Sequence, residues 1–252
     1  MIKFNENNIF LVTGASSGLG KATLLELNKL GAKVIAVGRN IESLNNVKDS
    51  SSFPENIYLE VFDFNKTDDI ALFIKDLVKK HGKLNGIAHF AGMAKLYPLR
   101  ATSLEIIKEI FELNFFSSYE IVRVMNDKRF KNQDEFSIVL TSSISSIRSF
   151  EGLSAYGMSK GAVNSLVVSS ALELAKNNVR INSILPGHIE TSMTNNLAEL
   201  QSEEYKNELI NSYPLGEGTP EDVAKLTVFL LSNSSKWITG QNIVVDGGRT
   251  LL

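Results

Sequence analysis

Short apolar runs alternate with longer amphipathic stretches along almost the whole chain. The apolar runs predict strands at residues 9–12, 33–37, 57–61, 86–90, 137–141, 180–185 and 243–245. Apolar residues at helical spacing predict helices at about 22–30, 67–80, 103–125, 154–176 and 219–231. This alternation predicts an α/β fold, a single doubly wound parallel sheet of about seven strands with helices on both faces. No linker or repeat interrupts it, so we expect one domain over residues 1–252, with a broken helical segment at 188–213 as a lid over the site.

The first predicted strand runs into a turn with three glycines at the spacing G-x-x-x-G-x-G. Gly14 would let the chain reverse tightly, Gly18 would leave room for phosphate groups, and Gly20 would let the next helix pack closely on the sheet. The helix N-terminus presents free N–H groups and a positive dipole end, which favour an anion. The turn therefore predicts a dinucleotide pyrophosphate site formed by Gly14, Ser16, Ser17, Gly18, Leu19 and Gly20.

Two other interpretations of this turn stay open. Residues 14–18 also fit G-x-S-x-G, the nucleophile elbow of α/β-hydrolases, which lies between a strand and a helix. That site needs an N–H group from a loop after an earlier strand, and only a dozen residues precede this turn. The other alternative is a glycine-rich surface turn.

The second predicted strand ends in Gly38-Arg39-Asn40, where NAD-binding folds usually place an acidic residue for the ribose hydroxyls. Arg39 could instead pair with a 2′-phosphate through two parallel hydrogen bonds. We therefore expect NADP(H) in preference to NAD(H), with Arg39 and Asn40 as candidate binding residues. The alternative is that Arg39 is a solvated loop residue, and Ser17 supplies no second basic group. Asp63 and Phe64 follow the third strand, whose end should face the same crevice.

Composition narrows the function classes further. The chain of 252 residues is 43% hydrophobic and 21% charged, has a formal net charge of −2 and shows no basic stripe, so we expect no nucleic-acid partner. The absence of cysteine excludes disulfides and thiolate metal sites, and we expect no metal. The polar N-terminus and the lack of a long apolar run predict no membrane span, and a cytoplasmic location.

Four polar residues are candidates for a proton-transfer site. Tyr156 and Lys160 lie four apart on a predicted helix and should share a face. An ammonium about 5 Å from the phenol, at an effective dielectric near 20, would lower its pKa by about two units and let it donate or accept a proton. Ser143, at a strand end, could hydrogen-bond a substrate carbonyl oxygen, although alone it is more often a turn residue. Asn114 is unusual inside a helix, so it has either a polar task or a surface position.

These motifs together resemble the short-chain dehydrogenase/reductase family over nearly the whole chain. The matching residues are T-G-A-S-S-G-L-G from Thr13 to Gly20, Asp63, Ala91-Gly92, Asn114, Ser143, the Tyr156 to Lys160 motif, Pro186-Gly187, and the stretch from Ile238 to Gly248. The resemblance implies a Rossmann-type fold and a small-molecule carbonyl or alcohol substrate. It also implies a homotetramer or homodimer.

The resemblance further implies roles for single residues. Tyr156 would be the acid/base, and Lys160 would bind the nicotinamide ribose and lower the tyrosine pKa. Ser143 would orient the substrate, and Asn114 would hold a water of the proton relay. Cofactor contacts would come from Asp63, Phe64, Ala91, Gly92, Pro186, Gly187, Ile189 and Thr191, with Asp63 by the adenine and Ile189 and Thr191 near the carboxamide.

One departure concerns the fourth strand, where the family usually has Asn-Asn-Ala-Gly and this chain has His89-Phe90-Ala91-Gly92. The loss of both amides removes hydrogen bonds that normally brace the central strands, which puts the cofactor geometry there in doubt. We expect His89 to be structural rather than catalytic.

The predicted activity is NADP(H)-dependent interconversion of a ketone or aldehyde and an alcohol. The substrate pocket should draw on 93–97, 144–152, His188 and the lid. The resemblance favours a 3-oxoacyl thioester as substrate, with sugar, polyol or steroid-like substrates as alternatives. A protein that binds NADP(H) as a sensor or scaffold without turnover is the alternative from another class.

Overall fold

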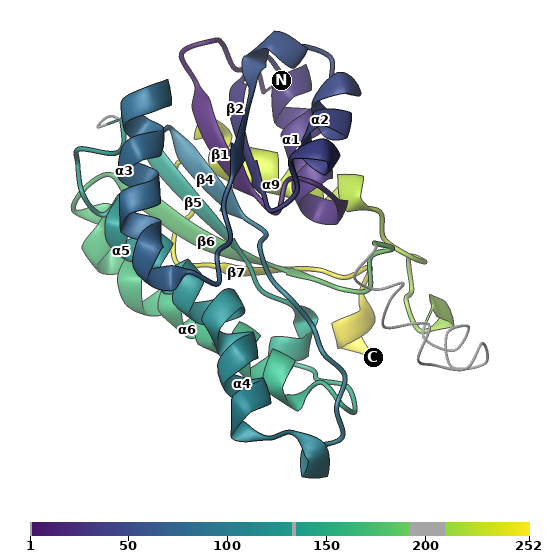
Figure 1. Ribbon diagram of the computed structural model, residues 1–252. Coiled ribbons are helices and arrows are strands. Elements are labelled where there is room, and N and C mark those ends of the chain that lie inside the picture. The colour runs from purple at the N-terminus through teal and green to yellow at the C-terminus, as the bar shows by residue number, and fades with distance from the viewer. Residues whose placement is uncertain (1, 133–134, 192–209) are drawn as a thin grey trace.

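The computed structural model, in which residues 2–132, 135–191 and 210–252 are described, contains one parallel sheet (Figure 1). The strand order is β3-β2-β1-β4-β5-β6-β7. The strands are β1 (Ile9–Thr13), β2 (Lys33–Gly38), β3 (Ile57–Val61), β4 (Gly86–His89), β5 (Phe136–Thr141), β6 (Val179–Pro186) and β7 (Asn242–Val245). The predicted α/β class and doubly wound parallel sheet are therefore confirmed.

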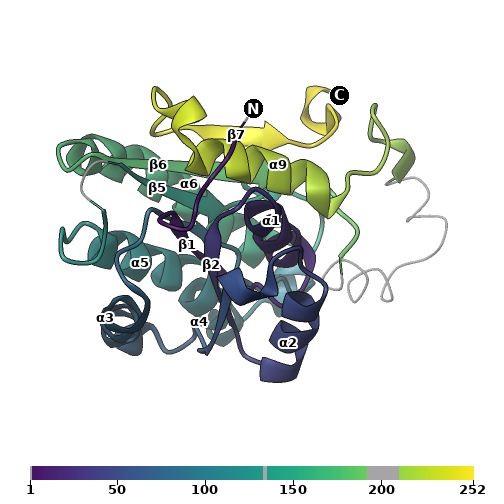
Figure 2. The ribbon, with the colours of Figure 1, turned by 90° about the horizontal axis from the view of Figure 1, so that it is seen from above.

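Helices cover both faces of this sheet, as predicted. The helices are α1 (Gly18–Lys29), α2 (Ile41–Asp49), α3 (Ile70–His81), α4 (Leu104–Phe111), the π-helix η4 (Glu112–Phe116), α5 (Ser117–Met125), α6 (Ser154–Ala175) and α9 (Pro220–Leu231). Short 3-10 turns are η1 (Pro54–Asn56), η2 (Thr67–Asp69), η3 (Leu99–Ala101), η5 (Ile144–Ser146), η6 (Asn233–Ser235) and η7 (Arg249–Leu251). Figures 1 and 2 show α1, α2 and α9 on one face and α3, α5 and α6 on the other.

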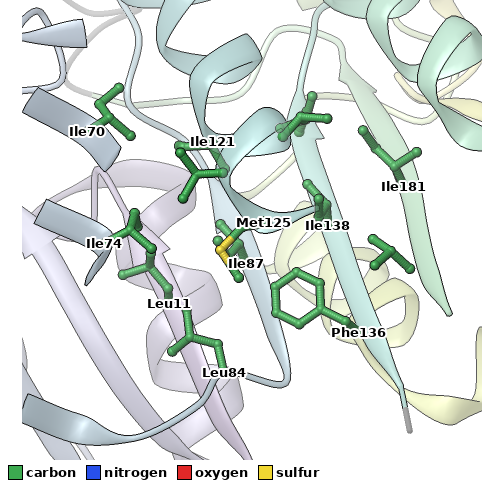
Figure 3. Close-up of a cluster of buried hydrophobic side chains, with 14 of the residues drawn as sticks. Leu11, Ile70, Ile74, Leu84, Ile87, Ile121, Met125, Phe136, Ile138 and Ile181 are labelled. Carbon is green, nitrogen blue, oxygen red and sulfur yellow. The ribbon is translucent and has the colours of Figure 1, made fainter. Parts of the chain in front are cut away.

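The hydrophobic core lies in two layers because successive side chains of a strand point to opposite faces. Leu11 of β1 is paired in register with Ile35 and Ile87, and all three are fully buried under α3, α5 and α6. Figure 3 labels Leu11 and Ile87 in this layer. The flanking Phe10 and Val12 belong to the second layer, under α1 and α9. Each such buried side chain stabilises the fold by roughly 1.5–3 kcal/mol relative to an exposed position.

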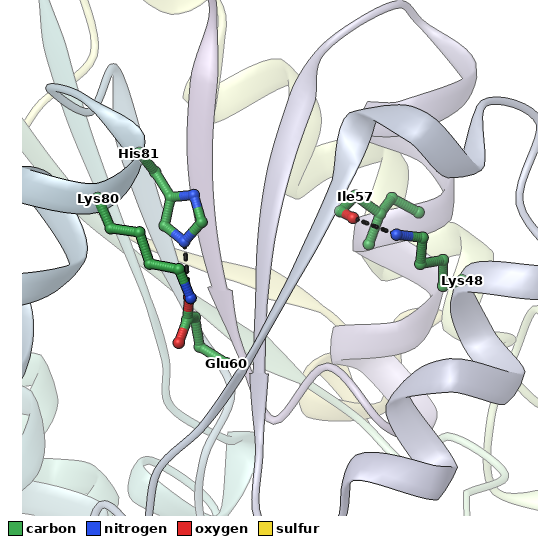
Figure 4. A network of polar contacts seen from close by, with 5 residues as sticks. All are labelled: Lys48, Ile57, Glu60, Lys80 and His81. Carbon is green, nitrogen blue, oxygen red and sulfur yellow. Dashed lines mark hydrogen bonds and ion pairs between the residues drawn. The ribbon is translucent and has the colours of Figure 1, made fainter.

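The outer edge strand β3 is held to the helices on both faces by polar contacts. Glu60 Oε1 accepts hydrogen bonds from Lys80 Nζ at 2.7 Å and pairs with His81 Nε2 at 2.6 Å (Figure 4). On the other side, Lys48 Nζ of α2 donates to the Ile57 carbonyl at 3.0 Å. Burial opposes ionisation of Glu60, but the bonds from Lys80 and His81 outweigh it and lower its pKa. These contacts fix β3, whose carboxyl end leads into the predicted adenine site.

Two helix predictions differ from the structure. Helix α2 was not predicted, and only Leu44 and Val47 of its nine residues are buried. The helix expected at 103–125 is two α-helices joined by η4, in which Leu113 and Asn114 are buried. The predicted lid at 188–213 lies mostly outside the described residues, which include only its two ends.

Candidate active site

A cavity of about 260 Å³ opens at the carboxyl ends of the strands, where β1 lies between β2 and β4. Chain connections run in opposite directions from this point, which is where doubly wound sheets bind ligands. Most of the predicted site residues line it, namely Gly14, Ser16, Ser17, Gly18, Leu19, Gly20, Arg39, Asp63, Phe64, Ala91, Gly92, Ser143, Tyr156, Lys160, Pro186, Gly187, Ile189 and Thr191.

The glycine turn has the backbone geometry that its spacing predicts. Gly14 and Gly18 have φ angles of 61° and 49°, in the left-handed region that side chains disfavour. A Cβ atom on Gly20 would lie 2.2 Å from the Gly14 carbonyl oxygen, so α1 packs directly on the end of β1. Helix α1 begins at Gly18 with its N-terminus at the cavity. Its free N–H groups and positive dipole end suit a phosphate there.

Arg39 and Asn40 follow β2 but differ in their positions. Arg39 is exposed and lines the cavity. Asn40 does not line it; its side chain accepts a hydrogen bond from the Ser43 N–H at 3.0 Å and caps α2. This capping role follows from the helix that the sequence did not predict, and cofactor binding by Asn40 stays a prediction. Asp63 lines the cavity while its Oδ1 accepts from the Asn65 N–H at 3.1 Å.

Tyr156 and Ser143 come together across the cavity from α6 and from the end of β5. Ser143 is 8% exposed, and its Oγ accepts a hydrogen bond from the Ser145 N–H at 3.1 Å. Burial raises the pKa of Tyr156, and a hydrogen bond with Ser143 partly opposes that rise. The two hydroxyl groups are thus close enough to hydrogen-bond the same substrate oxygen.

Lys160 does not lower the tyrosine pKa in the way expected from their spacing. Its Nζ donates to the Thr141 carbonyl at 2.8 Å and lies 5.7 Å from the centroid of the Tyr156 ring. Burial also lowers the pKa of Lys160 itself to about 8, which still leaves the amine mostly protonated near neutral pH. The expected drop in the Tyr156 pKa is therefore wrong for this geometry, because burial of the phenol has the larger effect.

The Asn114 side chain is buried and hydrogen-bonded, but it does not line the cavity. Its Oδ1 accepts a hydrogen bond from the Met93 N–H at 2.8 Å. Its Nδ2 donates to the Met93 carbonyl at 2.9 Å and to Ser159 Oγ at 3.0 Å. A Cβ atom on Gly92 would lie 3.1 Å from Asn114 Oδ1 and 3.5 Å from Lys160 Nζ. Asn114 therefore fixes the loop after β4 directly beside Lys160.

His89 replaces the missing amides as a brace between the central strands. The ring is 2% exposed, with Nδ1 at 2.8 Å from Thr13 Oγ1 of β1 and Nε2 at 3.0 Å from Ser117 Oγ of α5. Burial, together with the charge of Lys160, lowers the pKa of His89 to about 3. The expectation that the central strands lose their polar bracing is therefore wrong, whereas a structural His89 agrees with this burial.

The predicted substrate segments border two cavities: residues 145–146 and 149–152 line a second one together with Pro98 and Leu99, and not the cavity at the strand ends. Met93 lines the cavity at the strand ends, and the chain beyond is joined to the later segment by a hydrogen bond from the Tyr97 N–H to the Gly152 carbonyl at 2.9 Å. The His188 N–H donates to the Tyr213 hydroxyl at 2.8 Å, and His188 Nε2 lies 3.4 Å from Glu217 Oε1. The described ends of the 188–213 segment are thus in contact.

Several lining residues were not predicted: Gly38, Phe62, Leu113, Thr141 and Ser142. Four of them sit at or just after the carboxyl end of a strand, so the strand ends would have identified them. Leu113 reaches the cavity from the π-helix η4, which gave no separate signal in the sequence.

The residues that the structure describes include neither a metal-site cluster nor a membrane-spanning helix. No group of three or more histidines and acidic residues suited to a metal ion occurs among them. None of the helices in the described ranges is long and apolar enough to cross a bilayer.

Comparison with known proteins identifies the family. The model of the family described as enoyl-(acyl carrier protein) reductase matches residues 14–250. A 3-oxoacyl-[acyl-carrier-protein] reductase of Thermotoga maritima is 33% identical over 96% of this chain and 98% of its own length. A tropinone reductase homologue of Arabidopsis thaliana is 34% identical over 96% of this chain and 91% of its own.

A solved structure agrees with these sequence relatives. A short-chain type dehydrogenase/reductase from Mycobacterium ulcerans superposes with a TM-score of 0.90 at 32% identity, covering 99% of this chain and 92% of its own. The chain therefore belongs to the short-chain dehydrogenase/reductase family, whose members are oxidoreductases that act on carbonyl and alcohol groups.

Proposed function

We propose that this enzyme interconverts a ketone or aldehyde and an alcohol with NADP(H), using Tyr156 as the acid/base. The observation that carries the proposal is that Tyr156, Ser143 and Lys160 line the same cavity as the glycine turn. A proton donor and an anion site in one cleft are what hydride transfer from a dinucleotide to a carbonyl requires.

The residues present fit the cofactor. The backbone at Gly14, Gly20 and Gly92 approaches other groups so closely that a side chain there would fill or close the cradle. Arg39 is exposed at the cavity beside Gly38, and the Ser16 hydroxyl lies 3.5 Å from where a Cβ of Gly38 would be. An exposed guanidinium and a hydroxyl suit the 2′-phosphate that distinguishes NADP(H) from NAD(H).

When bound, the nicotinamide would supply or accept the hydride. Tyr156 would donate its proton to the substrate oxygen in reduction, and Ser143 would hydrogen-bond that oxygen as negative charge develops. Burial raises the pKa of Tyr156 and so favours the protonated phenol, which is the form that the reducing direction requires. Lys160 would hold the ribose through Nζ, and Asn114 would keep the neighbouring loop in place.

We propose a 3-oxoacyl thioester as the first substrate to test. The relative from Thermotoga maritima is a 3-oxoacyl-[acyl-carrier-protein] reductase, and 33% identity does not by itself fix the substrate. A cyclohexanol dehydrogenase of Acinetobacter, 30% identical over 98% of this chain, supports a cyclic alcohol or ketone as the second candidate. We also propose a homotetramer or homodimer, which light scattering on the purified protein would test.

The activity is tested by NADPH oxidation with 3-oxoacyl thioesters, cyclic ketones, sugars and enoyl thioesters. We expect turnover with a carbonyl compound, and a loss of about 10²- to 10⁴-fold in kcat for Tyr156→Phe with NADPH affinity retained. Tyr119→Phe, at an exposed tyrosine of α5 that does not line this cavity, is the matched control and should keep full activity. Binding of NADPH without turnover of any carbonyl would favour the sensor or scaffold, and equal turnover by Tyr156→Phe would refute the assigned acid/base.

A further inference from the structure

His89 stands at the centre of a hydrogen-bond chain that joins both halves of the site. Its ring is buried between β1 and α5 and packs edge-on against Phe64, with ring centroids 5.3 Å apart. The proposed reaction assigns this imidazole no proton to carry, although it contacts elements on both sides of the cavity.

The hydrogen bonds of Thr13 fix which ring nitrogen of His89 carries the proton. Thr13 Oγ1 accepts the backbone N–H groups of Phe90 and Ala91, each at 3.1 Å. A hydroxyl oxygen has two lone pairs, and both are then used. Its single proton must therefore point to the third partner, His89 Nδ1 at 2.8 Å, which makes Nδ1 an acceptor.

The proton consequently resides on Nε2 and is donated to Ser117 Oγ at 3.0 Å. Ser117 in turn donates its own proton to the Leu113 carbonyl, one turn back in η4. Every group in this series of hydrogen bonds then has a partner. Protonation of Nδ1 would break its hydrogen bond with Thr13, because Thr13 Oγ1 has no free lone pair to accept a second donor. The chain is satisfied only with a neutral imidazole.

The hydrogen bonds that run from His89 Nδ1 through Thr13, which we call the Nδ1 arm, reach the wall of the cavity. Thr13 holds the N–H groups of Phe90 and Ala91, both of which line the cavity. A Cβ atom on Gly14 would lie 3.0 Å from the Phe90 carbonyl carbon, so two backbone segments meet there with little space to spare. Loss of this arm would make the backbone at Phe90 and Ala91, which lines the proposed cofactor site, less rigid.

The hydrogen bonds that run from His89 Nε2 through Ser117 to Leu113, which we call the Nε2 arm, reach the side of the site that carries Tyr156. Ser117 and Leu113 bound the π-helical turn that carries Asn114. Asn114 donates to Ser159 Oγ, and Ser159 donates to the Tyr156 carbonyl at 2.7 Å. Loss of this arm would shift Asn114 and the first turns of α6 without altering the glycine turn.

We propose that His89, as its Nε2–H tautomer, is a positioning residue whose two nitrogens separately fix the cavity wall through Thr13 and the Asn114 turn through Ser117. This inference rests on the proposed function only for the part concerning turnover. Substitution of His89 by Asn or by Gln separates the two arms. An Asn amide can occupy the place of Nδ1 and keep the contact with Thr13, and a Gln amide can occupy the place of Nε2 and keep the contact with Ser117.

The test measures NADPH affinity by fluorescence titration, and kcat with a carbonyl substrate, for His89→Asn and His89→Gln. We expect His89→Asn to keep NADPH affinity and to lose about tenfold in kcat, whereas His89→Gln weakens NADPH binding about tenfold with a smaller effect on kcat. Ser117→Ala should reproduce the kcat loss of His89→Asn. Parallel changes in affinity and kcat for both variants would overturn the proposal, since general loosening of the core would produce them.

Nitrogen-15 NMR of the histidines in the wild-type protein tests the tautomer without any turnover. We expect His89 to show a protonated Nε2 and an unprotonated Nδ1 from pH 7 down to pH 5. A protonated Nδ1, or an imidazolium, would overturn the assignment even if the variants fail to fold. If no carbonyl is reduced, the proposed function fails, while the NMR result and the NADPH titrations still decide the role of His89.

Discussion

The burial of a neutral His89 predicts an acid-sensitive fold. Its pKa is about 3 in the native protein and 6.5 ordinarily, so below pH 6.5 the unfolded chain takes up a proton that the native protein does not. The contribution of His89 to stability is therefore complete above pH 6.5 and is lost progressively as the pH falls towards 3. Each pKa unit corresponds to about 1.4 kcal/mol, so at pH 5 the loss is about 2 kcal/mol.

Urea unfolding followed by circular dichroism at pH 7 and pH 5 measures this loss, at one protomer concentration because assembly would shift apparent stability. Other groups titrate as well, including His188, whose pKa burial also lowers. His89→Asn and His89→Gln carry these groups unchanged and serve as references. We expect the wild type to lose about 2 kcal/mol more than either variant between the two pH values. Equal losses in all three proteins would refute a buried neutral imidazole.

Three further predictions concern the cofactor cleft and the last helix. Gly20→Ala should lower stability by about 1–3 kcal/mol or more and weaken NADPH binding, since its Cβ would lie 2.2 Å from the Gly14 oxygen; unchanged melting and binding would contradict this packing. Arg39→Ala should weaken NADPH binding more than NADH binding in parallel titrations, and the reverse order would rule out a phosphate contact. Thr219→Ala removes the capping box at the start of α9 and should cost about 1 kcal/mol in urea unfolding, with kcat unchanged as a check that its effect is local.

The sequence predicted best those features that follow from local backbone chemistry. The strands and the glycine turn were predictable because buried parallel strands are continuous apolar runs and because the left-handed angles at Gly14 and Gly18 favour glycine. The meeting of Tyr156, Lys160 and Ser143 was predictable from helix spacing and from the position of strand ends.

What could not be predicted depends on tertiary contacts. The π-helical turn at Asn114 is fixed by partners 21 and 45 residues away, at Met93 and Ser159. His89 reaches across 76 residues to Thr13, so its role as a brace has no local signal. The Tyr156 pKa was predicted in the wrong direction because spacing gives the distance to Lys160 but not the burial of the phenol.

We propose that Tyr156 and Ser143 act together on the oxygen of a substrate held beside the nicotinamide. The most direct measurement is a crystal structure of the enzyme with NADP+ and the alcohol product of the substrate found in the panel. We expect both hydroxyl groups within about 3 Å of the ligand oxygen, and the ligand's carbinol carbon within about 3.5 Å of the nicotinamide ring. A Tyr156 hydroxyl directed away from the ring and out of reach of that oxygen would contradict the account.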